Sequence, residues 1–352
     1  MTKLDCHELD CHELDCHELQ KFWDLAGSQV KIKALEVALS RSLFDLLLEP
    51  CSIEEIAHKL AMPSTNIKGW IDLLWSMGCV DTAIDNKYIT SALAKRYMTS
   101  VSAMDCSQAL QFRFQTLRHF TEQFEALLYV PKNRNALSSA MAPLWAKAAK
   151  AQIFQEQRAV TVPALDRILD RVLNVTIAEE TPLHFLDLGG GPGLVALSLA
   201  RRFPNSTGVL FDFPETVKVA YKNIMEEGVE HRIEVQAGDL NKQSPNSQFD
   251  LIWCSSVLHF LDDATEAIKR ISALLKPNGI LLILHAEQTA EKKQCEGVLP
   301  FYLPMVMKGN YLPKQGEIAA LLDQNGLDVL QSEEITDFPM APVKLYCGRK
   351  VE

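Results

Sequence analysis

The pattern of apolar and polar positions changes near residue 180. From there on, short apolar runs alternate with stretches in which apolar residues recur every three or four positions, which predicts alternating strands and helices. The expected strands are 183–188, 207–211, 231–236, 249–254 and 279–285, and the expected helices are 194–203, 215–226, 263–275 and 315–325. This alternation is typical of a doubly wound, Rossmann-like α/β fold with a parallel sheet.

Two more strands are expected at the end of the chain, at 328–334 and 343–348. Only a short turn, residues 337–342, joins them. Because a parallel pair needs a long crossover connection, we expect these final strands to be antiparallel.

The first part of the chain is predicted to be mostly helical. Ser52 and Glu55 form the sequence signature of a capping box at the start of one short helix. The expected elements are helices at 21–48, 53–60 and 65–77, with a small hairpin at 78–89. A helix-turn-helix followed by a hairpin is similar to a winged helix.

Charge argues against a nucleic-acid partner for this winged-helix-like unit. Five basic and five acidic side chains fall between residues 52 and 98, so their charges cancel, and the whole chain has a net charge of −10. Proteins that bind nucleic acid carry a basic footprint, which is missing here. The unit is therefore expected to pack against another protein chain.

Residues 106–172 are predicted to be helical and contain many aromatic side chains. Most of these are expected in the core, and some could form the wall of an apolar ligand pocket. His119 lies among them and is expected to be structural. The aromatic residues are Phe112, Phe114, Phe120, Phe124, Trp145 and Phe154.

Residues 5–19 repeat Asp-Cys-His-Glu-Leu three times. Zinc could bind the repeated side chains, but a period of five does not place them on one helix face, so residues 1–20 are predicted to be a disordered tail. The candidate zinc ligands are Cys6, His7, Cys11, His12, Cys16 and His17.

Composition predicts a soluble, cytoplasmic protein. The 352 residues are long enough for two domains, and the nine cysteines form no C-x-x-C pair. No apolar run reaches membrane length, and the N-terminus is too polar for a signal peptide. We therefore expect a reducing compartment and no membrane partner.

The strongest local signal is a strand that runs directly into a glycine-rich turn. Residues 183–188 are followed by four glycines within five positions and then by a predicted helix. This geometry lets a ligand approach the backbone and meet free N–H groups at the helix start. Asp212, at the tip of the next strand and 19 residues beyond Gly193, can accept hydrogen bonds from ribose hydroxyls, so a nucleoside-bearing cofactor is predicted.

The identity of the cofactor depends on Asp187. The segment from Gly191 to Ala196 matches the dinucleotide pattern G-x-G-x-x-A, which alone is a weak signal. An acid at the end of the first strand would repel a pyrophosphate, whereas it suits a cationic amino-acid group. The spacing Asp-x-Gly-x-Gly-x-Gly resembles the first motif of class I S-adenosylmethionine methyltransferases. Asp239, which follows the third strand, could accept the adenine amino group.

The chain resembles the small-molecule O-methyltransferases with an N-terminal winged-helix dimerisation domain, such as caffeate-type and bacterial natural-product enzymes. The resemblance covers residues 21–352, and its specific motifs are Leu186–Gly193, Phe211-Asp212-Phe213-Pro214, Gly238-Asp239 and Val257-Leu258-His259. It implies a dimerisation domain at 21–105, linker and substrate-pocket helices at 106–180 and a methyltransferase domain at 181–352. In this family the N-terminal domains interlock two subunits and help to close the substrate pocket.

The resemblance also implies site residues for S-adenosyl-L-methionine and a small, aromatic hydroxyl acceptor. His259 falls on the family's catalytic base, and imidazole titrates in the range needed to take a proton from a phenol. We assign His285 and Glu287 to the catalytic group beside it. The expected cofactor contacts are Asp187, Gly189, Gly190, Gly191, Gly193, Asp212, Phe213, Gly238, Asp239, Leu240, Cys254 and Ser255.

The chain departs from the family pattern around this base. The usual His-Asp-Trp is replaced by His259-Phe260-Leu261, and Ser255 stands where lysine is common. His285 stands where the family has the carboxylate that orients the base, and Leu312 or a neighbour where it has a second acid. Residues 300–311 are unusually apolar and rich in Met and Pro, which suggests a reshaped acceptor pocket.

Two alternatives stay open. His259 and His285, with Asp262 or Glu287, could bind a divalent metal and support methyl transfer to carbon, and transfer to carbon or nitrogen without a metal is also possible. The chain could also keep the fold and the cofactor without methyltransferase chemistry.

Overall fold

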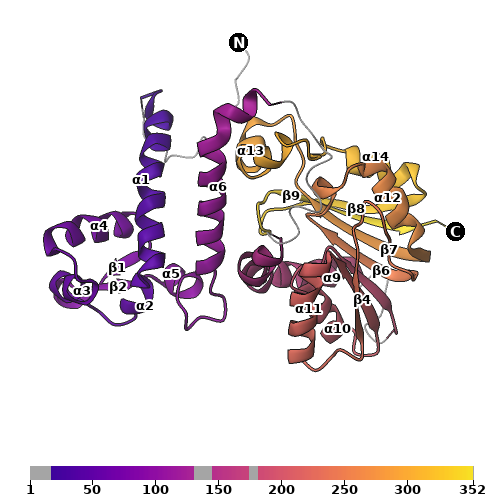
Figure 1. The fold of residues 1–352 in the computed structure, drawn as a ribbon, viewed down its shortest axis with the longest axis horizontal. Coiled ribbons are helices and arrows are strands. Elements are labelled where there is room, and N and C mark those ends of the chain that lie inside the picture. The colour runs from indigo at the N-terminus through magenta and orange to yellow at the C-terminus, as the bar shows by residue number, and fades with distance from the viewer. Residues whose placement is uncertain (1–16, 131–144, 174–180, 352) are drawn as a thin grey trace, which may run out of the picture. The chain divides into compact units, whose positions relative to one another are not determined.

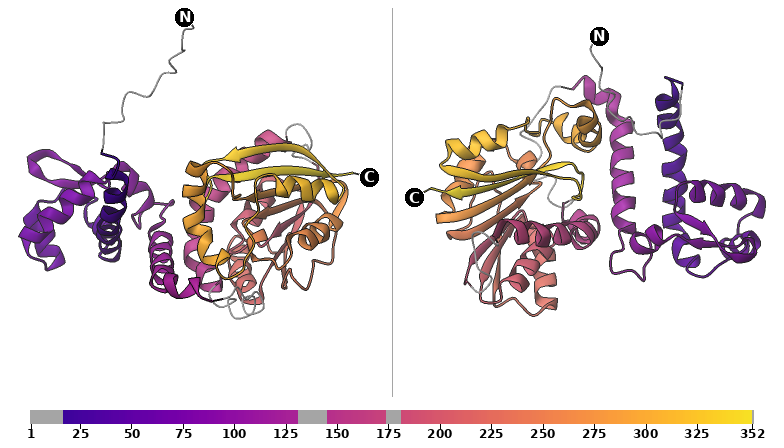
Figure 2. Two further views of the ribbon diagram at one scale, coloured as in Figure 1. Left: turned by 90° about the horizontal axis from the view of Figure 1, so that it is seen from above. Right: turned by 180° about the vertical axis from the view of Figure 1, so that it is seen from behind.

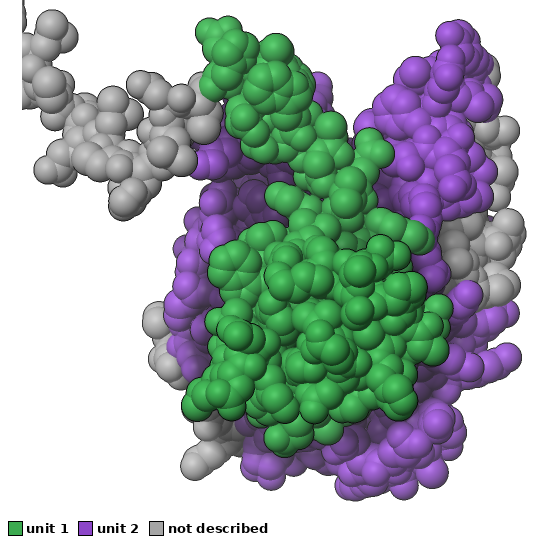
Figure 3. All heavy atoms as spheres, turned by 90° about the vertical axis from the view of Figure 1, so that its left-hand side faces the viewer, with its two compact units in different colours: residues 1–102 green, residues 103–352 purple. Residues whose placement is uncertain are grey.

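The structure, a computed structural model, describes residues 17–130, 145–173 and 181–351. Most of the Asp-Cys-His-Glu-Leu repeats, and with them the predicted tail, lie outside these residues. The chain divides into two compact units, residues 1–102 and 103–352, which Figure 3 shows in different colours.

The N-terminal unit contains the predicted helix-turn-helix and hairpin (Figure 1). Glu55 N donates to Ser52 Oγ at 3.2 Å and Ser52 N donates to Glu55 Oε2 at 2.7 Å, so the capping box is confirmed. The prediction of one helix at 21–48 is wrong, because Ser42 adopts a left-handed conformation (φ 50°) that separates two helices. The elements are α1 (Gln20–Ser40), α2 (Leu43–Leu46), α3 (Ile53–Leu60), α4 (Ser64–Ser76), β1 (Val80–Thr82), β2 (Tyr88–Thr90) and α5 (Ala92–Tyr97).

The C-terminal unit is built on a seven-stranded sheet in the order β5-β4-β3-β6-β7-β9-β8. Strands β3 to β7 are parallel, and β9 is antiparallel to both β7 and β8. The expected α/β fold with an antiparallel final pair is therefore confirmed, and Figure 2 shows that pair in yellow at one edge. The strands are β3 (His184–Leu188), β4 (Thr207–Asp212), β5 (Ile233–Ala237), β6 (Phe249–Ser255), β7 (Leu275–His285), β8 (Leu327–Ile335) and β9 (Val343–Lys350).

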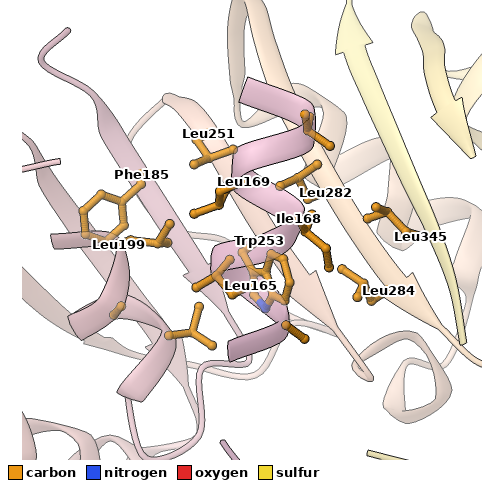
Figure 4. Packing of buried hydrophobic residues seen from close by; sticks show 14 of the residues in the cluster. Leu165, Ile168, Leu169, Phe185, Leu199, Leu251, Trp253, Leu282, Leu284 and Leu345 are labelled. Atoms are coloured by element: carbon orange, nitrogen blue, oxygen red, sulfur yellow. The ribbon is translucent and has the colours of Figure 1, made fainter. Parts of the chain in front are cut away.

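Helices cover both faces of this sheet, because alternate residues of each buried strand point to opposite sides. On one face, Phe185, Trp253 and Leu282 pack with the side chains of α9 (Figure 4). On the other face, Leu186 and Ile252 pack in a second cluster. The helices of the first face are α9 (Val162–Leu173), α10 (Leu194–Arg202) and α11 (Pro214–Glu226), and those of the second are α12 (Ala264–Ala273) and α14 (Glu317–Gln324).

Three further segments complete the C-terminal unit. The long helix α6 (Ser107–Leu128) was predicted, but α13 (Lys292–Val306) was not, because its interior holds Pro300 and Pro304, which usually interrupt a helix. Two π-helical turns, Ala149–Ile153 and Gln157–Thr161, flank the short helix α8 (Phe154–Glu156). None of the helices described here is both long and apolar enough to cross a membrane.

Candidate active site

A cavity of about 430 Å³ opens at the carboxyl ends of β3, β4, β5 and β6, where doubly wound sheets bind their ligands. Of the predicted site residues, it is lined by Asp187, Gly189, Gly191, Asp212, Phe213, Gly238, Asp239, Leu240, Ser255 and His259. Gly190, Gly193, Cys254, His285 and Glu287 do not line it.

The glycine turn after β3 needs its glycines for geometry. Gly189 has φ +68°, and a Cβ there would lie 2.5 Å from Val257 Cγ2. A Cβ on Gly190 would lie 2.6 Å from a carboxylate oxygen of Asp187. Gly193, with φ +88°, directly precedes α10. Gly190 and Gly193 therefore shape the turn, although they do not form the wall of the cavity.

Asp187 and Asp212 place two buried carboxylates at neighbouring strand ends. Asp187 Oδ2 accepts from Ala196 N at 3.0 Å, in the first turn of α10. Asp212 Oδ2 accepts from Gly191 N at 2.9 Å. Burial raises the pKa of Asp187 to about 7 and that of Asp212 to about 6, in spite of these backbone donors. Within the described part of the chain neither has an ion-pair partner, so a cation or hydroxyl donors from a ligand would stabilise both.

Asp239 lies at a more open position after β5. Its side chain accepts from Asn241 N at 3.0 Å and pairs with Lys242 at 3.2 Å. Both partners belong to the same turn. Asp239 nevertheless lines the cavity, together with Gly238 and Leu240.

Gln157 is a site residue that the sequence did not reveal. It lies in the second π-helical turn, and its Nε2 donates to Gly190 O at 3.1 Å while its Oε1 accepts from Leu194 N at 3.1 Å. Its amide therefore joins the two ends of the glycine turn. No local sequence pattern predicts this contact. Gly190 and Leu194 are 33 and 37 residues away from Gln157, and π turns have no sequence signature.

His259 and His285 form a hydrogen-bonded pair. His259 lies in the 3-10 turn Leu258–Phe260 after β6, and its Nδ1 is 3.0 Å from Nε2 of His285, the last residue of β7. His285 Nδ1 is 2.6 Å from Ala286 O. A carbonyl only accepts, so His285 Nδ1 carries a hydrogen and its Nε2 accepts from His259 Nδ1–H. This assignment leaves Nε2 of His259 as a free acceptor.

Both imidazoles of the pair are neutral near pH 7. Burial lowers the pKa of His285 to about 4. Burial, together with the neighbouring His285, lowers the pKa of His259 well below its ordinary value. His259 is 2% exposed and His285 is fully buried, so water does not stabilise a charge on either ring.

The structure does not bring Glu287 to this pair. Its Oε1 accepts from Tyr346 Oη at 2.7 Å and its Oε2 accepts from Gly316 N at 3.4 Å. The chain leaves β7 at His285, and the backbone of Gln288 then bonds with the segment before α14. Glu287 lies where the chain turns away from β7, so its side chain bonds to Tyr346 and Gly316 and not to the histidine pair.

The metal alternative lacks a third ligand. Within residues 17–130, 145–173 and 181–351, no three or more His, Cys, Asp or Glu side chains are grouped so that they could hold a metal ion. Glu287 is engaged as above, and the facing nitrogens of the two histidines bond each other.

Aromatic side chains form much of the remaining cavity wall. Trp145 packs edge-on against Phe260, with ring centroids 4.5 Å apart. Of the aromatic residues predicted from the sequence, Phe112, Phe120 and Trp145 line the cavity, whereas Phe114, Phe124 and Phe154 do not. His119 also lines it. The Met- and Pro-rich segment contributes Phe301, Pro304, Met305, Lys308, Gly309 and Asn310.

Comparison with known proteins identifies the domain that forms part of this cavity. Residues 186–281 match the family described as a methyltransferase domain. The chain is 28% identical over 149 residues to the mitomycin biosynthesis 6-O-methyltransferase of Streptomyces lavendulae, covering 42% of each chain. It is 26% identical over 263 residues to the acetylserotonin O-methyltransferase of Rattus norvegicus, covering 72% of this chain and 60% of that one. The aligned segments thus span about half the length of these curated relatives.

Solved structures show the same architecture along nearly the whole chain. An O-methyltransferase family protein from Burkholderia thailandensis superposes with a TM-score of 0.73 at 20% identity, covering 96% of this chain and 99% of that one. Residues 186–281 therefore carry a methyltransferase domain, and the predicted α/β fold with a helical N-terminal unit is confirmed for nearly the whole chain. The predicted enzyme class and cofactor agree with this match.

Proposed function

We propose that this methyltransferase transfers the methyl group of S-adenosyl-L-methionine to the hydroxyl of a small aromatic acceptor of natural-product type, with His259 as the general base. The observation that carries this proposal is that His259, whose Nδ1 is bonded to His285, lines the same cavity as Asp187 and Asp212. The relatives named for mitomycin and acetylserotonin support the class of acceptor.

The residues present fit the cofactor. Asp187 is buried and has no ion-pair partner among the described residues, so it suits the ammonium of the amino-acid part. Each oxygen of Asp212 has a further lone pair after its backbone bond and can accept from a ribose hydroxyl. Asp239 can accept from the adenine amino group. The glycine turn gives the space for a close approach of the ligand.

The reaction needs little chemistry from the protein beyond alignment and proton removal. The acceptor oxygen displaces the sulfonium, the carbon–sulfur bond breaks with its electron pair left on sulfur, and S-adenosylhomocysteine is the second product. The hydroxyl proton passes to Nε2 of His259. The His285 ring holds His259 in the tautomer whose Nε2 can accept that proton.

A labelled-methyl assay with a panel of phenols tests this function. We expect His259→Ala to lower turnover by about 10²-fold or more while cofactor binding, measured by calorimetry, stays unchanged. His231→Ala, which removes an exposed histidine outside the cavity, is the control. Near-normal turnover of His259→Ala would exclude the base, and methylation of carbon or nitrogen in place of oxygen would select the alternative reaction.

We further propose a homodimer through a winged-helix domain at residues 21–105. Helix α1 leaves five large apolar side chains between 43% and 64% exposed, which are Phe22, Trp23, Leu25, Val30 and Ile32. Monomeric proteins rarely expose so much apolar surface together. Analytical ultracentrifugation should give a dimer that dissociates in the double variant Leu25→Glu, Val30→Glu but not in Leu330→Glu on β8. A monomeric unsubstituted protein would refute the assignment.

The state of the cysteines supports a proposal for the location. All six cysteines in the described residues are free. This agrees with a reducing compartment, and we propose the cytoplasm. Oxidised cysteines in protein isolated under thiol-trapping conditions would argue against it.

A further inference from the structure

The hydrogen bonds of the histidine pair run in one direction and end on an uncharged group. His259 Nδ1 donates to His285 Nε2, and His285 Nδ1 donates to Ala286 O. Among the residues that the structure describes, no carboxylate bonds either ring. A proton taken up at His259 therefore creates a positive charge that no anion within the pair offsets.

The surroundings of the pair add no such anion. Tyr302 of α13 packs on both rings, with centroids 5.2 Å from His259 and 5.7 Å from His285. Burial raises the pKa of Tyr302 to about 12, so this side chain is neutral. The ring of Phe260 lies against that of His259, with ring centroids 3.8 Å apart.

Among the described residues, none of the charged side chains elsewhere on the cavity wall is hydrogen-bonded to the pair. Arg113 of α6 is bonded to Glu156 of α8, which neutralises both. Asp187, Asp212 and Asp239 form the cofactor side. The other titratable side chains on the wall are His119, Asp262 and Lys308.

We infer that the acceptor of this site carries an acidic hydroxyl, activated by an electron-withdrawing group on its ring, and that this hydroxyl binds as a neutral O–H donor to Nε2 of His259. The inference rests on the proposed O-methyl transfer and names its class of acceptor. A lone pair on Nε2 requires a proton donor, so an acceptor that arrives as a bare anion would be repelled.

The acidity requirement follows from proton transfer to a weak base. The pKa of an ordinary phenol is near 10, far above that of a buried neutral imidazole, and each unit of difference lowers the ionised fraction about tenfold. An electron-withdrawing group brings the two closer and reduces this penalty. The aromatic wall around Trp145, Phe260 and Phe301 suits a flat ring of this kind.

Three para-substituted phenols of similar shape test the inference. We compare kcat/KM for 4-methylphenol, 4-cyanophenol and 4-nitrophenol by the formation of S-adenosylhomocysteine. The rate should rise by about 10²-fold from the least to the most acidic phenol. His285→Glu, which places a carboxylate behind His259, should reduce this difference at least about tenfold. His285→Gln, whose amide oxygen accepts from Nδ1–H without charge, should keep the original dependence.

A second measurement reports the bound state without turnover. With S-adenosylhomocysteine in the site, bound 4-nitrophenol should lose its phenolate absorption band in the unsubstituted protein and in His285→Gln, and keep it in His285→Glu. Melting temperature and cofactor calorimetry show whether each variant is folded. A phenolate band in the unsubstituted complex, or a rate that does not depend on acidity, would overturn the inference and leave the proposed function standing. Absence of turnover with every phenol, despite cofactor binding, would overturn both.

Discussion

Replacing Asp187 with asparagine should stabilise the protein without cofactor and weaken its cofactor binding. The carboxylate is 1% exposed, and its pKa lies at about 7 instead of the ordinary 3.8. The folded state therefore binds a proton more tightly than the unfolded chain, and this group costs more stability as the pH rises from 3.8 to about 7. Asparagine keeps an oxygen for Ala196 N but has no charge to bury.

The magnitude follows from the pKa difference. A shift from 3.8 to about 7 corresponds to about 4 kcal/mol once the carboxyl is ionised in both states. Between about pH 5.5 and about pH 8 the cost grows by about 2 kcal/mol. The gain of Asp187→Asn should increase over the same interval. Loss of one charge-assisted hydrogen bond to an ammonium should weaken cofactor binding by about 10- to 100-fold.

Chemical denaturation of the cofactor-free protein at several pH values, followed by calorimetry with S-adenosylmethionine, measures both effects. Asp328→Asn, on the exposed face of β8, is the matched control and should change neither. The two expected effects have opposite signs, so general damage to the fold cannot produce them together. A variant that is less stable at pH 8, or that binds the cofactor normally, would refute the assignment of Asp187 to a buried, cation-binding role.

Three further substitutions probe the frame of the site. Gly189→Ala would place a Cβ 2.5 Å from Val257 at a φ of +68°, so stability should fall by about 1–3 kcal/mol in denaturant unfolding; an unchanged midpoint would contradict the tight turn. Gln157→Ala removes the bridge across the glycine turn and should raise the KM for S-adenosylmethionine more than it lowers kcat. An effect on kcat alone would contradict a role of Gln157 in shaping the cofactor site. Tyr346→Phe deprives Glu287 of its buried donor and should cost about 1–2 kcal/mol, with the loss growing above the ordinary pKa of a carboxyl group. The pH profile of kcat in Tyr346→Phe should not move, and a shift would connect Glu287 to the base.

The sheet was predictable because its strands are buried on both faces and are therefore uninterrupted apolar runs. The short turn before β9 was enough to predict the antiparallel pair. The predicted helices were wrong where a single backbone angle ends a helix or where a helix contains proline. Ser42 interrupts an otherwise helical pattern through one backbone angle, and α13 forms despite Pro300 and Pro304. Tertiary packing overrides local preference at both places.

That three of the predicted carboxylates line one cavity was predictable for a different reason. Each of these carboxylates follows a strand directly, so the position in the chain gives the position in space. Gln157 could not be found this way, since it reaches the glycine turn from a π-helical turn. Cys254 was predicted to contact the cofactor but does not line the cavity. Its neighbour Ser255 lines the cavity, and because side chains alternate along β6, Cys254 points into the second core cluster.

The departures from the family pattern around the base are consistent with a single change. A carboxylate at the position of His285 would be covered by Tyr302 and would need a cation or several donors to remain charged. A neutral ring there needs only one acceptor, which Ala286 O supplies from the same strand end. Because the site then holds no anion that needs polar partners, the adjoining segment can be apolar. Leu312 packs against the core cluster that contains Phe185 and Trp253. His285, Leu312 and the apolar sequence of α13 therefore belong to one physical arrangement, in which a neutral partner holds His259; under the proposed mechanism, the acidity required for the reaction is left to the acceptor.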